Sequence, residues 1–356
     1  MILWLLLAIN PVNTFPIELG EYSDRTLKME VREHGVYLNT NSGLIRFDFK
    51  GNITLEIPTS PEGLNRIATY HVGDDFIWIT DFGDQSSHFY DLNGKFLFKD
   101  EELFARVIQD MGNSTYLLTP GYTYDEDAPP SPFIHLINLS REPYPRMIQI
   151  FKIDYTPTAI NDKTRVVSFY KASKKIAEKL LQFKKVWAFE DNGTYTVINQ
   201  IENLSAIYTP AQLERERKVP LGQPFQARTA SMNLPGFKEV PGVFEGKPFY
   251  RDNKDYIREA LCWIWSQSTV VNIVPVPTGF VIGYLSPRDE CNFGNLVIAK
   301  LNRNFRFQTV LVEMDTYGLM GEVLGDKVYV LVPNYKIENG EISGSSPEIR
   351  AYGIPP

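Results

Sequence analysis

The chain has 356 residues, of which 43% are apolar and 13% aromatic, and its formal net charge is -7. This acidic balance excludes nucleic acid or an anionic membrane surface as a general partner, because both require a dominant basic surface. The abundance of Phe and Tyr favours strands over helices. A chain of this length forms either one large closed domain or two ordinary ones.

The chain begins with an apolar run, residues 1–9, that is too short to cross a bilayer but has the length of a signal-peptide core. No Lys or Arg precedes this run, and no clear cleavage site follows it. We therefore interpret residues 1–14 either as the remainder of a signal peptide or as a buried strand. The first alternative predicts a periplasmic or extracellular protein, and the second a cytoplasmic one.

A strand-and-turn pattern then recurs along the chain. Alternating apolar residues lead into Asp or Asn and a turn that carries Gly or Asn, at residues 43–53, 87–96, 133–140 and 296–305. This pattern is typical of β-hairpins, and a recurrence at roughly forty residues is the period of a β-propeller blade. The sequence therefore predicts an all-β fold, a six-bladed β-propeller.

Each blade has four antiparallel strands, named A to D from the central channel outward. The predicted strands of the first three blades are 27–32, 36–38, 44–48, 53–57; 67–72, 76–80, 88–92, 95–98; and 105–110, 115–119, 133–139, 147–153. Those of the last three are 186–190, 195–199, 206–210, 215–220; 271–276, 280–285, 296–301, 305–312; and 319–324, 327–332, 348–352.

The sixth blade lacks a D strand. We expect residues 15–22 to close the ring beside it as an N-terminal strand, which leaves no long unpaired edge. A single propeller domain then spans residues 15–356. A seventh blade within residues 221–269 is the alternative count.

Two insertions, residues 155–185 and 221–269, interrupt the blades. In the first, Ile176, Ala177, Leu180 and Leu181 share one helical face. In the second, Asp252 is a plausible N-cap for a helix whose apolar stripe is Ile257, Leu261 and Ile264. We predict two short helices on one face of the propeller.

The connection lengths distinguish the two ends of each blade. The A-to-B and C-to-D turns are short and carry Gly or Asn, which supply the positive φ of tight hairpins. The long connections all join B to C or D to A: 120–132, 155–185, 221–269, 286–295 and 333–347. We call this the loop end and the opposite one the turn end, and we expect function at the loop end.

The loop end collects the candidate binding residues, which are aromatic or acidic. They are Tyr122, Tyr124, Asp125, Glu126, Asp127, Trp263, Trp265 and Tyr335. Tyr and Trp make recognition surfaces, whereas the acidic run matches no known cation loop and is interpreted as solvated in preference to a Ca²⁺ site. Cys262 and Cys291 also belong to this end, as a disulfide in an exported protein or as two buried thiols.

A second group of polar residues is predicted on the A strands, which line the channel. It comprises Glu30, Arg32, His71, Asp110, Glu190, Asn272 and Glu322. Carboxylates and amides from different blades can hold a divalent cation such as Ca²⁺, with Glu322 and Asn272 as the best candidate ligands. The simpler interpretation is a polar lining that binds water. Asp81 and Asp84 share a face at the end of a B strand.

The segments 45–53 and 89–96 resemble the C-to-D hairpins of the bacterial six-bladed β-propellers of the NHL and TolB-like kind. The resemblance implies an exported protein that binds peptides, glycans or other proteins. A minority of such proteins are metal-dependent hydrolases or lyases. The chain departs from the pattern in lacking a lipid-attachment Cys and in its two insertions.

We therefore expect a non-catalytic binding propeller that uses its loop end, requires no cofactor and has no integral membrane segment. The alternative is a metal-dependent hydrolase or lyase with its cation at the top of the channel.

Overall fold

The structure is a computed structural model of the chain. It describes residues 11–18, 28–40, 42–60, 63–101, 103–105, 107–110, 115–119, 133–140, 146–154, 186–191, 194–199, 204–208, 218–220, 233–237, 268–286, 294–338 and 341–355. Every regular element within these residues is a β-strand, which confirms the all-β class. The two predicted helices lie outside the described residues.

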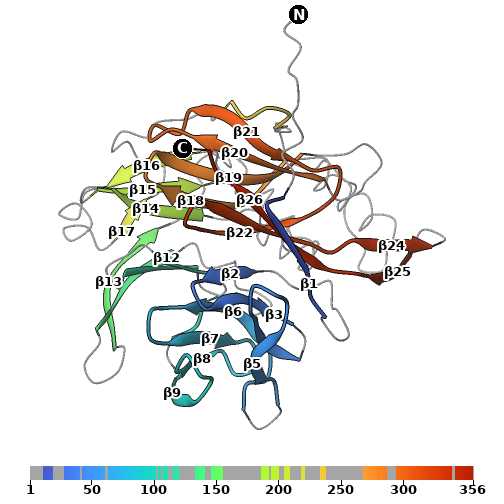
Figure 1. Cartoon of the computed structure of the whole chain (residues 1–356). Coiled ribbons are helices and arrows are strands. Elements are labelled where there is room, and N and C mark those ends of the chain that lie inside the picture. Colours follow the sequence, from blue (N-terminus) through green and yellow to red (C-terminus); the bar gives the residue numbers. More distant parts are fainter. Residues whose placement is uncertain are drawn as a thin grey trace, which may run out of the picture. The chain divides into compact units, whose positions relative to one another are not determined.

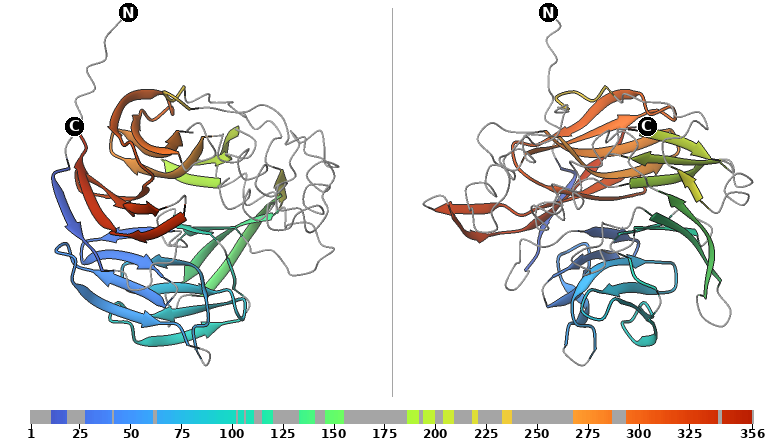
Figure 2. Two further views of the ribbon diagram at one scale, coloured as in Figure 1. Left: turned by 90° about the vertical axis from the view of Figure 1, so that its right-hand side faces the viewer. Right: turned by 180° about the vertical axis from the view of Figure 1, so that it is seen from behind.

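The chain divides into two compact units. The first comprises Met1–Ile57, Met232–Gly242 and Leu261–Pro356, and the second comprises Pro58–Ser231 and Val243–Ala260. Both units are built from sheets whose strands are antiparallel except for one parallel pair in the second unit, and Figures 1 and 2 show these sheets as layers of adjoining arrows. One propeller domain over residues 15–356 and the number of blades remain predictions.

Two sheets of the first unit are four-stranded meanders. One contains β2 (Met29–Arg32), β3 (Gly35–Asn39), β4 (Gly43–Phe47) and β5 (Ile53–Pro58). The other contains β18 (Thr269–Val276), β19 (Gly279–Ser286), β20 (Asn295–Leu301) and β21 (Phe307–Glu313). Both have the strand order predicted for a propeller blade, and their strand bounds differ from the predicted ones by a few residues at most.

The third sheet of this unit joins the two ends of the described chain. It contains β22 (Leu319–Leu324), β23 (Lys327–Val332), β26 (Glu348–Gly353) and β1 (Asn13–Pro16). β1 pairs antiparallel with β26, with Asn13 opposite Ala351 and Pro16 opposite Glu348 (Figure 1). The predicted pairing of an N-terminal strand with the last sheet is thus confirmed. The strand begins earlier than predicted, because Phe15 is its buried residue and Asn13 extends the ladder.

A hairpin of β24 (Tyr335–Glu338) and β25 (Glu341–Ser345) occupies the connection that was predicted as a long loop. Its sequence signal was present, because Asn339-Gly340 between two alternating segments is a strong hairpin turn. The loop prediction for residues 333–347 was therefore wrong in part.

In the second unit, one sheet is a meander of β6 (Ile67–Val72), β7 (Ile77–Asp81), β8 (Ser86–Tyr90) and β9 (Phe96–Asp100), as predicted for the second blade. Another contains β10 (Val107–Asp110), β11 (Thr115–Thr119), β12 (Phe133–Ser140), β13 (Arg146–Asp154) and β17 (Lys218–Pro220). A third has only β14 (Val186–Asp191), β15 (Thr194–Asn199) and β16 (Leu204–Tyr208).

The prediction that residues 215–220 form the D strand of the fourth blade was wrong. β17 pairs in parallel with β13, with Lys152 opposite Lys218, and therefore belongs to the preceding sheet. The outer edge of the long strand β13 provides unpaired backbone groups, and Pro220, which lacks an N–H, suits the edge position that β17 then takes.

Three C-to-D turns share one hydrogen-bond pattern. The side-chain oxygen of Asp48 accepts the backbone N–H groups of residues 50 and 52, that of Asp91 those of residues 93 and 95, and that of Asn302 those of residues 304 and 306, all within 2.9–3.0 Å. The residue three places after each Asp or Asn has positive φ, at Gly51, Gly94 and Phe305. The repeated sequence pattern therefore reflects a turn that needs an Asp or Asn side chain as hydrogen-bond acceptor and a residue with positive φ three places later.

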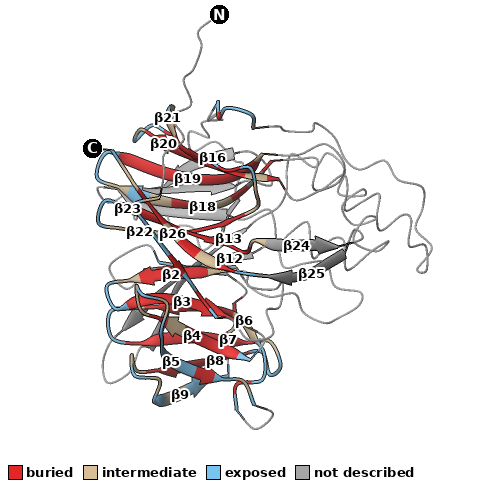
Figure 3. Cartoon of the chain, turned by 45° about the vertical axis from the view of Figure 1, so that its right-hand side comes forward, coloured by how far each residue is buried: buried red, intermediate tan, exposed pale blue. Residues whose placement is uncertain are grey.

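In the β2–β5 and β6–β9 sheets, buried residues concentrate on the middle strands, and exposed ones on turns and on the outer strands β5 and β9 (Figure 3). In the first unit the first strands of the three sheets, β18, β22 and β2, lie beside one another. In the second unit β6 lies beside β10. First strands therefore bring polar residues from different sheets together.

Candidate functional site

The first strands of the first unit contain two β-bulges. The register of β22 against β23 shifts between Met320 and Val323, so that Gly321 and Glu322 are left out of the ladder. The register of β18 against β19 shifts between Val270 and Asn272. Bulges redirect side chains and are frequent beside functional sites. They place the two predicted metal ligands, Glu322 and Asn272, at irregular positions of neighbouring strands.

Gly321 lets β2 approach the bulge of β22 closely. A Cβ at this position would lie 2.5 Å from Cε of Met29 and 3.4 Å from Cγ2 of Val31. A larger residue would therefore require the Met29 side chain, which packs over Gly321, to shift. The close approach brings Glu30 and Arg32 of β2 to the side chain of Glu322.

Charged side chains of β2, of the residue before it and of β22 form a connected network, which we call the inner cluster: Lys28, Glu30, Arg32 and Glu322. The Glu30 carboxylate is only 1% exposed, and it contacts Lys28 Nζ through Oε1 at 2.5 Å and Arg32 through Oε2 at 2.8 Å. The Arg32 guanidinium also forms an ion pair with Glu322. Two cations thus compensate two carboxylates, as a buried charge requires.

Asn272 links β18 to β22 through a hydrogen bond. Its Nδ2 donates a hydrogen bond of 2.9 Å to the carbonyl oxygen of Gly321, and its Oδ1 accepts one of 2.9 Å from the N–H of Ile273. The side chain therefore pairs with a backbone carbonyl that the bulge has released from the ladder. This role was not predicted, because the bulge has no sequence signal beyond the glycine.

The structure thus brings Glu322 and Asn272 to adjacent strands, as the metal hypothesis requires. However, the Glu322 carboxylate is compensated by a guanidinium, and the Asn272 amide holds the bulge. A cation bound through Oε2 of Glu322 would have to compete with the Arg32 guanidinium. The arrangement as it stands fastens three sheets together.

In the second unit, His71 of β6 and Asp110 of β10 form a contact between the first strands of two sheets, as Arg32 and Glu322 do in the first unit. His71 Nε2 lies 3.6 Å from Asp110 Oδ2, and its side chain is 2% exposed while that of Asp110 is 45% exposed. The rings of Tyr116 and Phe76 approach the imidazole edge-on, at centroid distances of 5.1 and 6.3 Å. The imidazole is packed among aromatic side chains.

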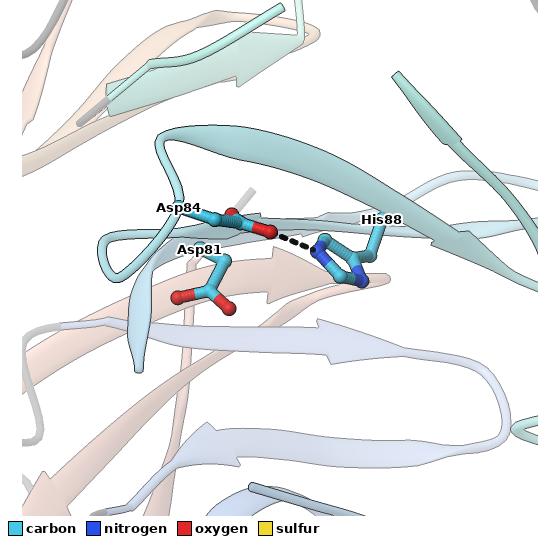
Figure 4. A group of neighbouring side chains, drawn as sticks. All are labelled: Asp81, Asp84 and His88. Carbon is cyan, nitrogen blue, oxygen red and sulfur yellow. Dashed lines mark ion pairs between the residues drawn. The ribbon is translucent and has the colours of Figure 1, made fainter. Parts of the chain in front are cut away.

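A third cluster, Asp81, Asp84 and His88, lies at the loop end of the β6–β9 sheet (Figure 4), with potential ligand atoms within 4.8 Å of one another. Asp84 Oδ2 lies 3.5 Å from His88 Nε2 and 2.9 Å from Lys99 Nζ. Asp81 instead accepts three backbone N–H groups. The Lys99 ammonium group thus already compensates the Asp84 carboxylate.

Most of the predicted binding-face residues lie outside the described residues. This holds for Tyr122, Tyr124, Asp125, Glu126, Asp127, Trp263 and Trp265, and for Cys262 and Cys291. Tyr335 lies in β24. Arg32, which forms the ion pair with Glu322, was among the polar residues of the predicted A strands, but the pairing of the two was not predicted.

Comparison with solved structures was informative about the fold alone. A protein from Bacteroides fragilis, provisionally named as exported, aligns with 96% of this chain and 95% of its own at 10% identity, with a TM-score of 0.50. A member of the DUF4221 family from Bacteroides vulgatus aligns with 97% of both chains, also at 10% identity and a TM-score of 0.50. These values show a shared fold over nearly the whole chain.

The WD40 domain of Neurospora crassa Pan2 gives a TM-score of 0.45 at 7% identity, over 98% of this chain and 96% of that domain, which is too low to assign a fold. No protein-family model matches the chain. No curated protein matches it either. Among the described residues, no helix has the length and apolarity needed to cross a membrane.

Proposed function

We propose that this protein is an exported, non-catalytic recognition protein that binds a protein, peptide or glycan at the loop end of its sheets. The observation that carries this proposal is the distribution of connection lengths. The three longest connections between the strands, residues 120–132, 155–185 and 221–268, all join strands at the loop end, and the β24–β25 hairpin lies between β23 and β26 at the same end. The hairpins at the turn end of the four-stranded sheets are short.

The rigid sheets and the long connections favour recognition because binding residues are commonly placed on loops that a stable scaffold holds. The connections also carry Tyr and Trp, which contribute most of the energy at many interfaces. Export is supported by the fold that this chain shares with the Bacteroides fragilis protein, which is provisionally named as exported. Metal-dependent hydrolysis or lyase chemistry is the rival function, and a cation at Glu322 would then compete with the Arg32 guanidinium.

The test compares ligand binding by the full chain with that of two variants. The first variant carries Tyr122→Ala and Tyr124→Ala at the loop end, and the matched control carries Asn93→Ala and Lys95→Ala at a C-to-D turn. Each is applied to arrays of synthetic peptides and purified glycans after its melting temperature has been measured. We expect reproducible ligands that the first variant loses and the control retains. Absence of any ligand, or loss only in the control, would contradict the proposal.

A further inference from the structure

At the loop end of the β6–β9 sheet, Asp81 holds together two backbone segments, residues 65–66 and 82–83, which we call the platform. Its carboxylate, which is 0% exposed, accepts the backbone N–H groups of Asn65 at 2.5 Å, Arg66 at 2.8 Å and Gly83 at 2.7 Å. These hydrogen bonds join the connection before β6 to the turn after β7. A buried carboxylate therefore fixes the backbone of this platform.

Two side chains of the platform are preorganised on its surface. The exposed Arg66 guanidinium stacks on the ring of Phe82, with Cζ 5.0 Å from the ring centroid. Asn65 packs over Gly83 so closely that a Cβ there would lie 2.6 Å from its Nδ2. Side chains that are already ordered lose little conformational entropy when a partner binds.

The other charges next to the platform already have partners. Lys99 Nζ lies 2.9 Å from Asp84 and 3.2 Å from Glu101, and His88 lies 3.5 Å from Asp84. In the part of the chain that the structure describes, the Arg66 guanidinium makes the stacking contact and no ion pair. Arg66 is therefore the charge that this surface offers to a ligand.

We propose that Arg66 binds a carboxylate of an acidic peptide segment in a partner protein. A guanidinium presents paired N–H donors that match a carboxylate, and Arg is enriched among the residues that dominate protein interfaces. A glycan is disfavoured because the guanidinium covers the face of Phe82 on which a sugar ring would stack. The inference rests on the proposed recognition function and assigns part of it to this sheet.

The experiment uses the full chain and an array of dodecapeptides in matched pairs, one member carrying Asp or Glu where the other carries Asn or Gln. Arg66→Gln is compared with Lys95→Gln, which removes the same charge at the turn end of the same sheet. Arg66→Lys tests the planar donor geometry. Oligogalacturonate serves as an acidic glycan probe, and melting temperatures verify folding.

We expect the wild type to prefer acidic peptides and Arg66→Gln to weaken their binding by about tenfold, as for an interface residue of this kind. Arg66→Lys should lose several-fold, and Lys95→Gln should stay within about twofold. Equal losses in Arg66→Gln and Lys95→Gln would overturn the inference, as would binding of oligogalacturonate without acidic peptides.

The two proposals fail in different ways. If the Tyr122 and Tyr124 changes abolish peptide binding and Arg66→Gln does not alter it, the role of Arg66 is refuted and the recognition function stands. If the wild type binds no peptide and no glycan, the recognition function is refuted together with the role of Arg66.

Discussion

Arg32 of β2 and Glu322 of β22 form an ion pair that joins the first strands of two sheets. The two residues are 290 positions apart in the sequence. The same guanidinium contacts Glu30, which is almost fully buried. The pair therefore ties the beginning of the described chain to its end. It also makes Arg32 the link between a buried carboxylate and a partly exposed one.

Removing these two carboxylates should have unequal effects on stability. Glu30→Gln leaves Lys28 and Arg32 without their buried partner and should lower the free energy of unfolding by about 3 kcal/mol. Glu322→Gln breaks a partly exposed pair and should cost about 1 kcal/mol. Urea unfolding measures both, with the exposed Glu56→Gln as a control expected to be near neutral. Equal losses for both variants would contradict the assignment.

Calcium distinguishes the recognition proposal from its metal-dependent rival. Because Arg32 compensates Glu322, we expect millimolar Ca²⁺ to leave the melting temperature of the wild type unchanged. A calcium-dependent increase in the wild type that Glu322→Gln abolishes would favour the metal-dependent function. The same increase in both proteins would indicate a cation site elsewhere.

Most of the described sheet structure could be predicted from the sequence, because the signals for hairpins are local. Asp48, Asp91 and Asn302 each begin the same type of turn. The same short sequence pattern therefore marks each of these hairpins. The pairing of β17 with β13 could not be predicted in this way. It depends on which edge is available in three dimensions, and the short segment Lys218–Pro220 carries no information about its partner.

The candidate site was only partly predictable. Polar residues on the first strands identified Glu322 and Asn272, but nothing in the sequence beyond Gly321 indicated the bulge that leaves Gly321 and Glu322 out of the ladder. Similarly, Arg66 looked like any surface residue in the sequence. Its position depends on the hydrogen bond that its backbone N–H donates to the carboxylate of Asp81, fifteen residues away.

Ser87 should be essential to the packing of the β6–β9 sheet. Its Oγ accepts a hydrogen bond of 2.8 Å from Trp78 Nε1 and donates one of 2.6 Å to the carbonyl oxygen of Leu103. Ser87→Ala leaves the buried indole N–H and this carbonyl unpaired and should cost about 2 kcal/mol. Urea unfolding tests this, and Ser42→Ala, at an exposed serine, serves as the control. Equal stability of both variants would refute the role of Ser87.

The turn at Asp91 should accept Asn but not Ala. Asn302 makes the same two hydrogen bonds in the turn before β21, so a carboxamide oxygen suffices at this position. Asp91→Ala should lose about 1 kcal/mol of stability, whereas Asp91→Asn should lose almost none. If Asp91→Asn is as unstable as Asp91→Ala, the charge of Asp91 rather than its hydrogen-bond geometry stabilises the turn.

The last prediction concerns the acid stability of the loop end at Asp84. Burial acts to raise the pKa of Asp84, but the hydrogen bonds from Ser86 and Lys99, together with the charges of Lys99 and His88, outweigh it and lower the pKa from 3.8. The folded protein therefore favours the carboxylate more than the unfolded chain does. This contribution is fully present above the unfolded pKa and is lost as the pH falls through the lower folded pKa.

Asp84→Asn should therefore be less stable than the wild type near neutral pH, and the difference should shrink as the pH falls below about 4. Urea unfolding at a series of pH values measures this difference. Asp315→Asn, at an exposed aspartate of the first unit, should keep the acid dependence of the wild type. A difference between Asp84→Asn and the wild type that stays constant down to acidic pH would show that the carboxylate contributes through packing and not through its charge.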